Sequence, residues 1–419
     1  MIQRNLSFII YHLLFSIALL LLTACGGQRP PQSWAERLQE SPAPDSLVFR
    51  YARLIHVEQA EGYRVVYIDN PWKPGKGLHT YVLVSYDAPV PENIPGGTLV
   101  RTPLRRSVVF TSVHCALIDQ LQATAQVAGV ADLKYIKVPF VQQGVSSGRI
   151  ADCGDGMSPV VEKIIDTEAD AILLSPFENA GGYGRMENIG IPIIECAEYM
   201  EASPLARAEW MRFYGMLYGQ EALAEQLFIK VETDYMALKQ QAATAERRPS
   251  VLVDKMAGSV WYVPGGRSTI GQMLRDANAD YPWADDTHSG SLQLAFETVL
   301  ERAGESDFWL FRYDSPTPIT LSQLLSEKDG YRMMRPVRSA SMSGGMAHSV
   351  PVSVSGGSPA GNRVYGCNVT TSMFYEETPF RPDLLLQDLI KILHPDIPNL
   401  PEPRYYHKVK SEEFATARL

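Results

Sequence analysis

The stretch from Ser203 to Glu246 constrains the fold more than any other part of the chain. Ser203 is a favourable N-cap, and Pro204 fits the first helical turn because no N–H donor is needed there. Apolar residues then recur at steps of three and four, which predicts a helix with one buried face. They are Trp210, Tyr214, Leu217, Ala224, Phe228, Val231, Tyr235 and Leu238, and Glu221 alone interrupts them.

Two glycines, Gly215 and Gly219, lie inside this stretch, so we expect two helices that meet near Gly219. The second helix should end near Ala245, before Pro249. Residues 203–249 are then either a core helix pair of one large domain or a connector between two lobes. We favour the connector, because strand–helix alternation occurs on both sides of it.

Length and charge narrow the class of protein. A chain of 419 residues can hold two domains of ordinary size. The 38 basic and 47 acidic residues give a net charge of −9, and no basic block follows the N-terminus. Nucleic acid is therefore not an expected partner. A hydrophobic content of 45% is enough for well-formed cores.

The N-terminus reads as a targeting segment. Arg4 precedes an apolar run, Phe8–Leu22, that is short for a transmembrane helix but suits a signal peptide. Small residues directly before Cys25 resemble the lipobox of bacterial lipoproteins. We therefore expect a signal peptide at 1–24, lipidation of Cys25 and a proline-rich tether at 25–44. The alternatives are an ordinary signal peptide and a membrane anchor.

The other four cysteines, Cys115, Cys153, Cys196 and Cys367, lack CxxC spacing. An exported protein can oxidise them, but the sequence does not determine their pairing. They form no zinc-type cluster, and we expect no catalytic cofactor.

The part before the connector, residues 45–202, reads as a small β segment followed by an α/β lobe. The β segment is predicted at Leu47–Val57, Tyr63–Asp69 and Thr80–Tyr86. The lobe alternates strands and helices, as in a parallel sheet. Its strands are predicted at Ser107–Val113, Ala171–Leu174 and Ile191–Ile194, and its helices at His114–Gln126 and Ser158–Glu168.

After the connector, residues 250–398 repeat this alternation as a second α/β lobe, followed by a tail at 399–419. Strands are predicted at Val251–Asp254, Val260–Val263, Phe308–Phe311 and Arg363–Val369, and helices at Thr269–Ala277, Leu292–Ala303 and Leu384–Leu393. Ser339–Gly361 has the composition of an exposed loop. The predicted fold class is α/β: two lobes, each with a central mostly parallel sheet, joined by a long connecting helix, plus a small N-terminal β segment.

Several phrases together resemble the solute-binding proteins of bacterial ABC importers, in the helix-linked class that captures ferric siderophores, haem or cobalamin. The resemblance runs from about residue 47 to 395. It is carried by Ser112–His114, Gly154–Ile165, Ala169–Ile172, Pro204–Trp210, Tyr262–Gly266 and Phe374–Asp383. Ser339–Gly361 departs from the pattern, since this class has a short helix there.

The resemblance implies a ligand held between two lobes and delivery to an ABC permease of the inner membrane. It also implies one exposed glutamate in each lobe that docks on the permease. By position these are Glu162 and Glu297, each near the start of a predicted helix. The alternative is simple helix-end electrostatics, because a carboxylate early in a helix is stabilised by the helix dipole.

Candidate ligand contacts follow from residue type. Gly266 and Arg267 open a helix after a strand, where backbone N–H groups can receive an anion, although a plain loop-to-helix turn fits equally. Aromatic side chains suit a flat macrocycle or an aromatic siderophore, and those considered are Trp72, Tyr183, Trp261 and Tyr262. Packing in the core is the alternative for each.

His114 lies where a predicted strand ends and a helix begins, so it is a candidate ligand for iron or cobalt. A hydrogen-bonded structural histidine is the alternative. We expect no resident metal site, because His79 and His288 complete no convincing set with His114.

The expected function is therefore capture of a small metal complex, an iron chelate, haem or cobalamin, without covalent chemistry. We expect a monomer in the cell envelope, facing the periplasm and held to the membrane by lipid. A zinc- or manganese-binding protein of the same architecture is one alternative. A hydrolase using Ser146 in a GxSxG pattern is another, but loop composition follows it where a nucleophile elbow needs a helix.

Overall fold

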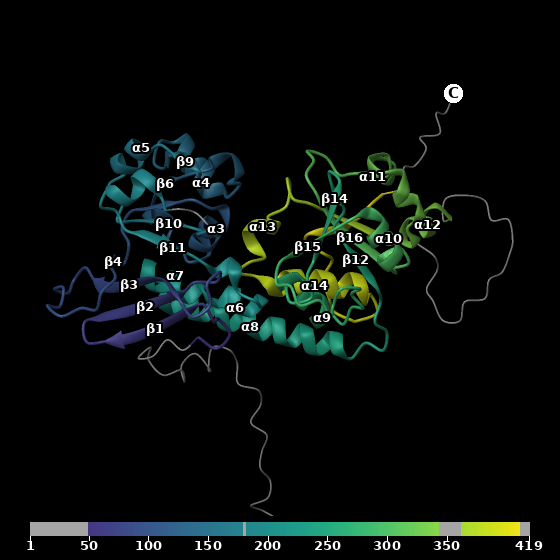
Figure 1. The fold of residues 1–419 in the computed structure, drawn as a ribbon, viewed down its shortest axis with the longest axis horizontal. Helices are drawn as coiled ribbons and strands as arrows, with labels where there is room; N and C mark the ends of the chain where they lie inside the picture. Colours follow the sequence, from purple (N-terminus) through teal and green to yellow (C-terminus); the bar gives the residue numbers. More distant parts are fainter. Residues whose placement is uncertain (1–48, 179–181, 343–361, 411–419) are drawn as a thin grey trace, which may run out of the picture. The chain divides into compact units, whose positions relative to one another are not determined.

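The computed structural model describes residues 49–178, 182–342 and 362–410, and Figure 1 shows its ribbon. The predicted signal peptide, Cys25 and the tether lie outside these residues, so those assignments stay predictions. The predicted α/β class is confirmed, with separate sheets before and after a helical connector.

A four-stranded sheet opens the described part of the chain. In spatial order it consists of β1 (Ile55–Ala60), β2 (Tyr63–Asp69), β3 (Gly77–Ser85) and β4 (Thr98–Thr102). The first three strands pair antiparallel, and β4 adds parallel to β3. The predicted β segment is present, but its first strand begins at Ile55 rather than Leu47, and the sequence patterns did not indicate β4.

The segment before β1 is irregular because its backbone N–H groups bind two carboxylates instead of a neighbouring strand. The N–H groups of Arg50, Tyr51 and Ala52 donate to Glu209 at 2.7–2.9 Å. Those of the next two residues, 53 and 54, donate to Glu201 at 3.0–3.1 Å. Both glutamates are buried.

The first lobe contains a five-stranded parallel sheet with the order β11-β10-β5-β6-β7. Its strands are β5 (Ser107–Val109), β6 (Val127–Val130), β7 (Ala151–Asp152), β10 (Ala171–Leu174) and β11 (Ile193–Glu195). The main helices are α3 (Ser112–Gln120), α4 (Pro139–Ser146) and α5 (Val161–Asp166), and β8 (Gly154–Asp155) and β9 (Ser158–Pro159) form a short ribbon.

Local backbone conformation explains why two predicted helices of this lobe are shorter than expected. Helix α3 is capped by Thr111 and ends before Gln122, which has a positive φ of 57°. Helix α5 ends before Glu168, whose φ is 52°. Neither residue is a glycine, so these left-handed positions could not be predicted from residue type.

The connector consists of α6 (Pro204–Glu209), α7 (Met211–Tyr218) and α8 (Glu221–Ala243). The predicted cap is present, since the Ser203 hydroxyl accepts the Ala206 N–H at 3.1 Å. The break at Gly219 is also confirmed, because this residue caps α7 with a φ of 68°. Every residue of α7 is buried, whereas α8 buries one face and leaves the other in solvent.

The second lobe has a central sheet with the order β12-β16-β17-β18. Its strands are β12 (Val251–Val253), β16 (Phe308–Tyr313), β17 (Val364–Asn368) and β18 (Tyr406–Lys408), of which the first three are parallel. A smaller antiparallel sheet contains β13 (Met256–Ala257), β14 (Val260–Pro264) and β15 (Ser291–Leu294).

Six helices are described in this lobe. They are α9 (Thr269–Asp276), α10 (Phe296–Ala303), α11 (Leu321–Glu327), α12 (Arg335–Met342), α13 (Phe374–Glu377) and α14 (Pro382–Leu393). Helix α14 packs against α8 of the connector, and α13 packs against α3 of the first lobe. Figure 1 shows the second pair, α13 and α3, side by side.

Three predictions in this lobe need correction. Leu292–Ala303 is not one helix, because its first part is strand β15, which pairs with β14. The stretch after residue 398 is not a separate tail, because β18 pairs with β17 and extends the central sheet. The predicted loop Ser339–Gly361 begins too early, since Ser339–Met342 belong to α12, and residues 343–361 lie outside the described residues.

Substitution of Gly219 should test how tightly the connector packs. A Cβ on Gly219 would lie 2.9 Å from the Pro103 Cβ, whereas one on Gly258, with φ 61°, would meet open space. We expect Gly258→Ala to lose about 1 kcal/mol of unfolding free energy from its positive φ alone. Gly219→Ala should lose clearly more in urea unfolding, because it adds a steric overlap. Equal losses would contradict close packing at this turn.

Candidate functional site

A cavity of about 200 Å³ lies where α3 and α6 meet the second lobe. On the side of the first lobe and the connector it is lined by Val113, Pro204 and Arg207. On the side of the second lobe it is lined by Thr269, Ile270, Met273, Arg312, Phe374, Tyr375, Thr378, Pro379 and Leu385. Both lobes therefore contribute to one small cavity that carries two guanidinium groups.

Arg312 lies near the carboxyl end of β16 and is held in a fixed orientation. Its Nε and Nη2 atoms donate to Asp254 at 2.9 and 2.6 Å. The rings of Phe374 and Tyr375 lie 5.9 and 5.8 Å from the guanidinium carbon, within the range of cation–π contact. Burial lowers the pKa of Arg312, but hydrogen bonding and charge attraction to Asp254 outweigh it, so the pKa lies above its usual value.

Arg207 lies on α6 on the opposite wall of the cavity. Its Nε atom has no accessible surface and no hydrogen-bond partner. Burial lowers the pKa of this guanidinium, and the negative charge of Glu198 opposes that effect. Within the described residues, no carboxylate forms an ion pair with Arg207, which distinguishes it from Arg312.

His114 is fully buried behind this wall rather than exposed in the cavity. Its Nε2 atom lies 3.3 Å from Glu198 Oε1, and its Nδ1 atom has no partner. The ring lies 5.4 Å from that of Tyr214, which in turn contacts Phe380 of the second lobe at 5.7 Å. The structure thus places His114 in a buried polar cluster, while its neighbour Val113 lines the cavity.

Tyr183 lies in a different hollow, of about 640 Å³, beside β4 and β11. Its hydroxyl donates to Glu195 Oε1 at 2.6 Å, and burial raises its pKa. The other Glu195 oxygen lies 2.9 Å from His79 Nδ1, and His79 Nε2 lies 2.7 Å from Thr98 Oγ1. These bonds join the N-terminal sheet to the edge of the first-lobe sheet.

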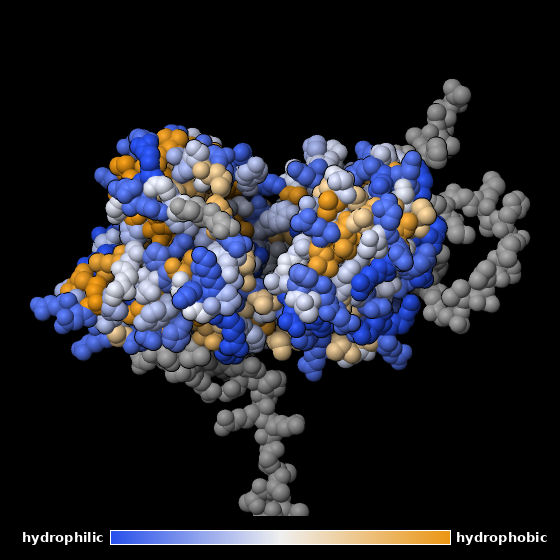
Figure 2. All heavy atoms as spheres, viewed as in Figure 1, coloured by the Kyte–Doolittle hydropathy of each residue, from blue (hydrophilic) through white to orange (hydrophobic). Residues whose placement is uncertain are grey.

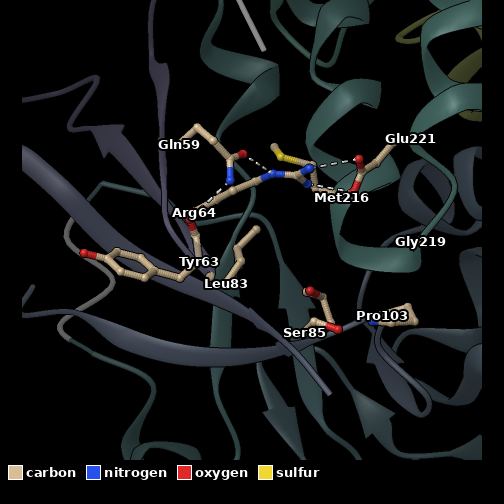
Figure 3. Close-up of a pocket in the computed structure, with 11 residues that line it drawn as sticks. Gln59, Tyr63, Arg64, Leu83, Ser85, Pro103, Met216, Gly219 and Glu221 are labelled. Atoms are coloured by element: carbon tan, nitrogen blue, oxygen red, sulfur yellow. Dashed lines mark hydrogen bonds and ion pairs between the residues drawn. The ribbon is translucent and has the colours of Figure 1, made fainter. Parts of the chain in front are cut away.

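A third hollow, of about 260 Å³, lies between the N-terminal sheet and the connector. Figure 3 shows Arg64 reaching Gln59 and Glu221 across it, with Met216 beside them. The two Arg64–Glu221 contacts are 2.7 and 3.1 Å. This pair explains why an acidic residue interrupts the apolar stripe at position 221.

The aromatic candidates occupy different environments. Trp261 has no exposed surface, and its indole N–H donates to the Val253 carbonyl at 3.0 Å. Tyr262, its neighbour on β14, points the other way and is 40% exposed. Trp72 is partly buried in the β2–β3 turn. None of these three lines the cavity between the lobes.

Backbone N–H groups of the glycine turn before α9 already have hydrogen-bond partners within the chain. The Gly265 N–H donates to the Gly290 carbonyl, and the Arg267 N–H donates to the His288 carbonyl. Gly266 is buried and Arg267 is exposed. The start of this helix nevertheless lies at the cavity, because Thr269 and Ile270 of its first turn line it.

Glu162 and Glu297 lie where the sequence predicted, each exposed in the first turn of its helix. Glu162 does not line the cavity, and its carboxylate pairs with Arg185 at 2.6 Å. This hydrogen bond, with help from the helix start, lowers the pKa of the Glu162 carboxyl. Both lobes thus present an acidic helix start on their surfaces.

The remaining candidates have ordinary structural contacts. Ser146 ends helix α4, and its hydroxyl donates to the Gln142 carbonyl at 2.8 Å, so the strand–turn–helix of a nucleophile elbow is not formed there. Cys115, Cys153, Cys196 and Cys367 are buried free thiols. Burial raises the pKa of Cys153 to about 11 and that of Cys367 to about 12.

Within the described ranges, no group of three or more His, Cys, Asp or Glu side chains converges in a way that suits a metal ion. In those same ranges, no helix combines the length and apolar character needed to cross a bilayer.

The principal cavity residues, Arg207 and Arg312, were not among the predicted contacts. Both left a signal in the sequence. Arg207 stands between alanines on a short helix whose other positions are mostly buried, and Arg312 comes directly after the apolar run Phe308–Phe311 within β16. Ligands of parallel α/β sheets commonly bind at the carboxyl ends of strands, where Arg312 lies.

Comparison with known proteins identifies the family. Residues 109–333 match the family model described as periplasmic binding protein. This match spans most of the first lobe, the connector and much of the second lobe. The chain belongs to the periplasmic binding protein family.

Individual relatives are distant. An uncharacterized lipoprotein of Methanocaldococcus jannaschii is 27% identical over 273 residues, or 62% of this chain and 64% of that relative, which is less than two thirds of its length. A periplasmic heme binding protein from Pseudomonas aeruginosa superimposes with a TM-score of 0.53 and 14% identity, over 74% of this chain and 99% of that one. The molybdate periplasmic binding protein of Haemophilus influenzae superimposes with a TM-score of 0.52 and 15% identity, over 71% of this chain and 88% of that one. These structures support the fold alone.

Removal of the Asp254 charge should test how firmly Arg312 is held. Asp254 has a φ of 60°, which asparagine tolerates, so Asp254→Asn removes the charge with little backbone strain. We expect a loss of about 1–3 kcal/mol in unfolding free energy, because a partly buried guanidinium loses its counter-ion. The matched control is Asp280→Asn at an exposed position. Equal stability of both variants would contradict a structural role for the Arg312–Asp254 pair.

Proposed function

We propose that this chain is the substrate-binding component of an ABC importer. It captures a small metal complex, an iron chelate, haem or cobalamin, between its lobes and delivers it to a membrane permease. One observation carries the proposal: both lobes of a periplasmic binding protein fold contribute side chains to the same cavity. Such a cavity can couple occupancy to the relative position of the lobes.

The fold does not select the ligand by itself. The two solved structures described above are named for heme and for molybdate, which differ greatly in size and chemistry. A zinc- or manganese-binding function is the second candidate in this architecture. The described residues give it no support, because they hold no converging set of metal ligands.

The proposed permease contacts are the exposed helix starts at Glu162 and Glu297. The surface near Glu162 also carries the exposed hydrophobic residues Met157, Val160 and Ile165, which are 74%, 40% and 48% exposed. Figure 2 shows hydrophobic colour over the region where Figure 1 labels α5 and β9. Charged residues beside exposed apolar ones suit a protein–protein contact in which charge sets orientation.

Attachment to the membrane through a lipid on Cys25 completes the proposal. The Methanocaldococcus jannaschii relative is named a lipoprotein, which supports an envelope location. A capture protein tethered in this way stays near its permease, so the tether raises the local concentration of the loaded form.

Ligand titration of the purified full-length chain tests the proposed function. Tryptophan fluorescence would be followed against a ferric siderophore, haemin, cobalamin, Zn²⁺ and Mn²⁺. We expect a saturable change with at least one complex and none with the free metal ions. Saturation by a free metal alone would favour the second candidate, and no response to any probe would contradict ligand capture.

Charge reversal tests the docking surfaces. Glu162→Arg combined with Glu297→Arg should lower uptake in cells by about tenfold or more, because favourable charge contacts become repulsive. Ligand affinity should stay within about twofold, since neither residue lines the cavity. The matched control is Asp166→Arg with Glu301→Arg, exposed acidic residues one turn later on the same helices. A parallel fall in affinity and uptake would place the two glutamates in the ligand site instead.

A further inference from the structure

The geometry points to a compact anion as the ligand of the cavity between the lobes, bridged by Arg207 from one wall and Arg312 from the other. This inference rests on the proposed function and specifies its ligand class. The shared chemistry is a group of negatively charged oxygens, either the carboxylates of a small metal chelate or an inorganic oxyanion.

The two walls share a layered arrangement of charge. On each side a guanidinium lines the cavity, and a buried carboxylate lies away from it. In the second lobe this carboxylate is Asp254, which holds Arg312 through two hydrogen bonds. On the opposite wall it is Glu198, which acts on Arg207 electrostatically. Because neither carboxylate lines the cavity, the charges nearest a bound molecule are positive.

Arg207 gives the stronger indication of a missing partner. A guanidinium offers five N–H donors in a planar fork that matches oxygen anions. Here the Nε donor is buried and unpaired, and the described residues supply no ion pair to the group. Burial of an unpaired charge is costly, so a ligand that brings oxygen anions to this position gains binding energy. Arg312 is already neutralised by Asp254, so it serves mainly to orient the ligand.

The size and lining of the cavity restrict the anion further. A volume of about 200 Å³ is below the roughly 300–1,000 Å³ typical of pockets for drug-sized molecules. Phe374 and Tyr375 form an aromatic wall beside Arg312, and the Tyr375 hydroxyl oxygen lies 3.5 Å from the Arg312 Nη1 atom. The cavity in this arrangement therefore suits a small, rounded anion and not an extended macrocycle.

The arrangement also couples ligand charge to closure. An anion in the cavity is attracted to Arg207 on one wall and to Arg312 on the other, so its binding favours approach of the two walls. Two direct contacts already join the two sides in this structure, namely the edge-to-face contact of Tyr214 with Phe380 and the hydrogen bond that the Lys137 ammonium donates to the Val369 carbonyl. Arg207 is thus a specificity-determining residue whose charge links binding to lobe position.

The experiment is calorimetric titration of the full-length chain with molybdate, ferric citrate, cyanocobalamin and Zn²⁺. We expect molybdate or ferric citrate to bind, and whichever does distinguishes an inorganic oxyanion from a carboxylate chelate. Arg207→Gln should weaken that binding about 10- to 100-fold, the loss typical of a hydrogen-bonded charge contact. Arg207→Lys should recover part of it, because charge is kept while the fork is lost. The control Arg332→Gln removes an exposed arginine elsewhere in the second lobe and should stay within twofold.

Two readouts separate a ligand contact from a merely structural role. Small-angle scattering should show compaction with the anion in the wild type and not in Arg207→Gln. Affinity of the wild type should fall as NaCl is raised, and Arg207→Gln should show a smaller salt dependence. Thermal unfolding confirms that each variant is folded before titration.

The outcomes separate this inference from the proposed function. Binding of cyanocobalamin or Zn²⁺ with no binding of either anion would overturn the anion assignment and leave ligand capture standing. Anion binding that is unchanged in Arg207→Gln would overturn the role of Arg207. If the wild type binds none of the four probes, the anion assignment fails, whereas the proposed function fails only if the fluorescence titration with a ferric siderophore and haemin is also negative.

Discussion

The arrangement of the chain depends on two buried carboxylates at the start of the connector. Glu201 and Glu209 together receive five consecutive backbone N–H groups from the segment that precedes β1. Glu209 also accepts a hydrogen bond from Arg212 at 2.7 Å, and Glu201 accepts one from the Trp210 indole at 2.9 Å. Full hydrogen bonding offsets the large cost of burying these charges.

These bonds fix more than the N-terminal segment. Glu209 ends helix α6, and Arg207 lies on that same short helix. A helix of this length has little stability alone, so its position depends on tertiary contacts at both ends. The Ser203 cap holds one end and the carboxylate contacts hold the other. The guanidinium on the first wall of the cavity is therefore positioned by the same network that attaches the N-terminal sheet.

Sequence patterns predicted the parts of the fold that depend on local composition. Ala171–Leu174 is a buried strand with the predicted bounds, because an uninterrupted apolar run of that length fits a parallel sheet. The helix break at Gly219 followed from a residue that readily adopts positive φ. The strand β15 was missed because Ser291–Leu294 has no strong local preference, and its strand form comes from pairing with β14.

The candidate site was harder to predict, because side-chain direction depends on neighbours distant in sequence. Trp261 and Tyr262 are adjacent, yet alternation along β14 buries the first and exposes the second. Aromatic composition alone could not say which of them faces a ligand. Arg207 and Arg312 are 105 positions apart in the chain, and they line the same cavity only when both lobes are folded. Prediction by residue type therefore favoured aromatic and glycine positions over the two arginines.

The buried free thiols have a practical consequence. Cys115, Cys153 and Cys196 lie in the first lobe, and Cys367 lies in the second. Since solvent does not reach them in the folded state, a thiol reagent can modify each one only when its surroundings open. The rates at which a thiol reagent labels these cysteines, followed by mass spectrometry, would therefore report the local opening of each lobe separately.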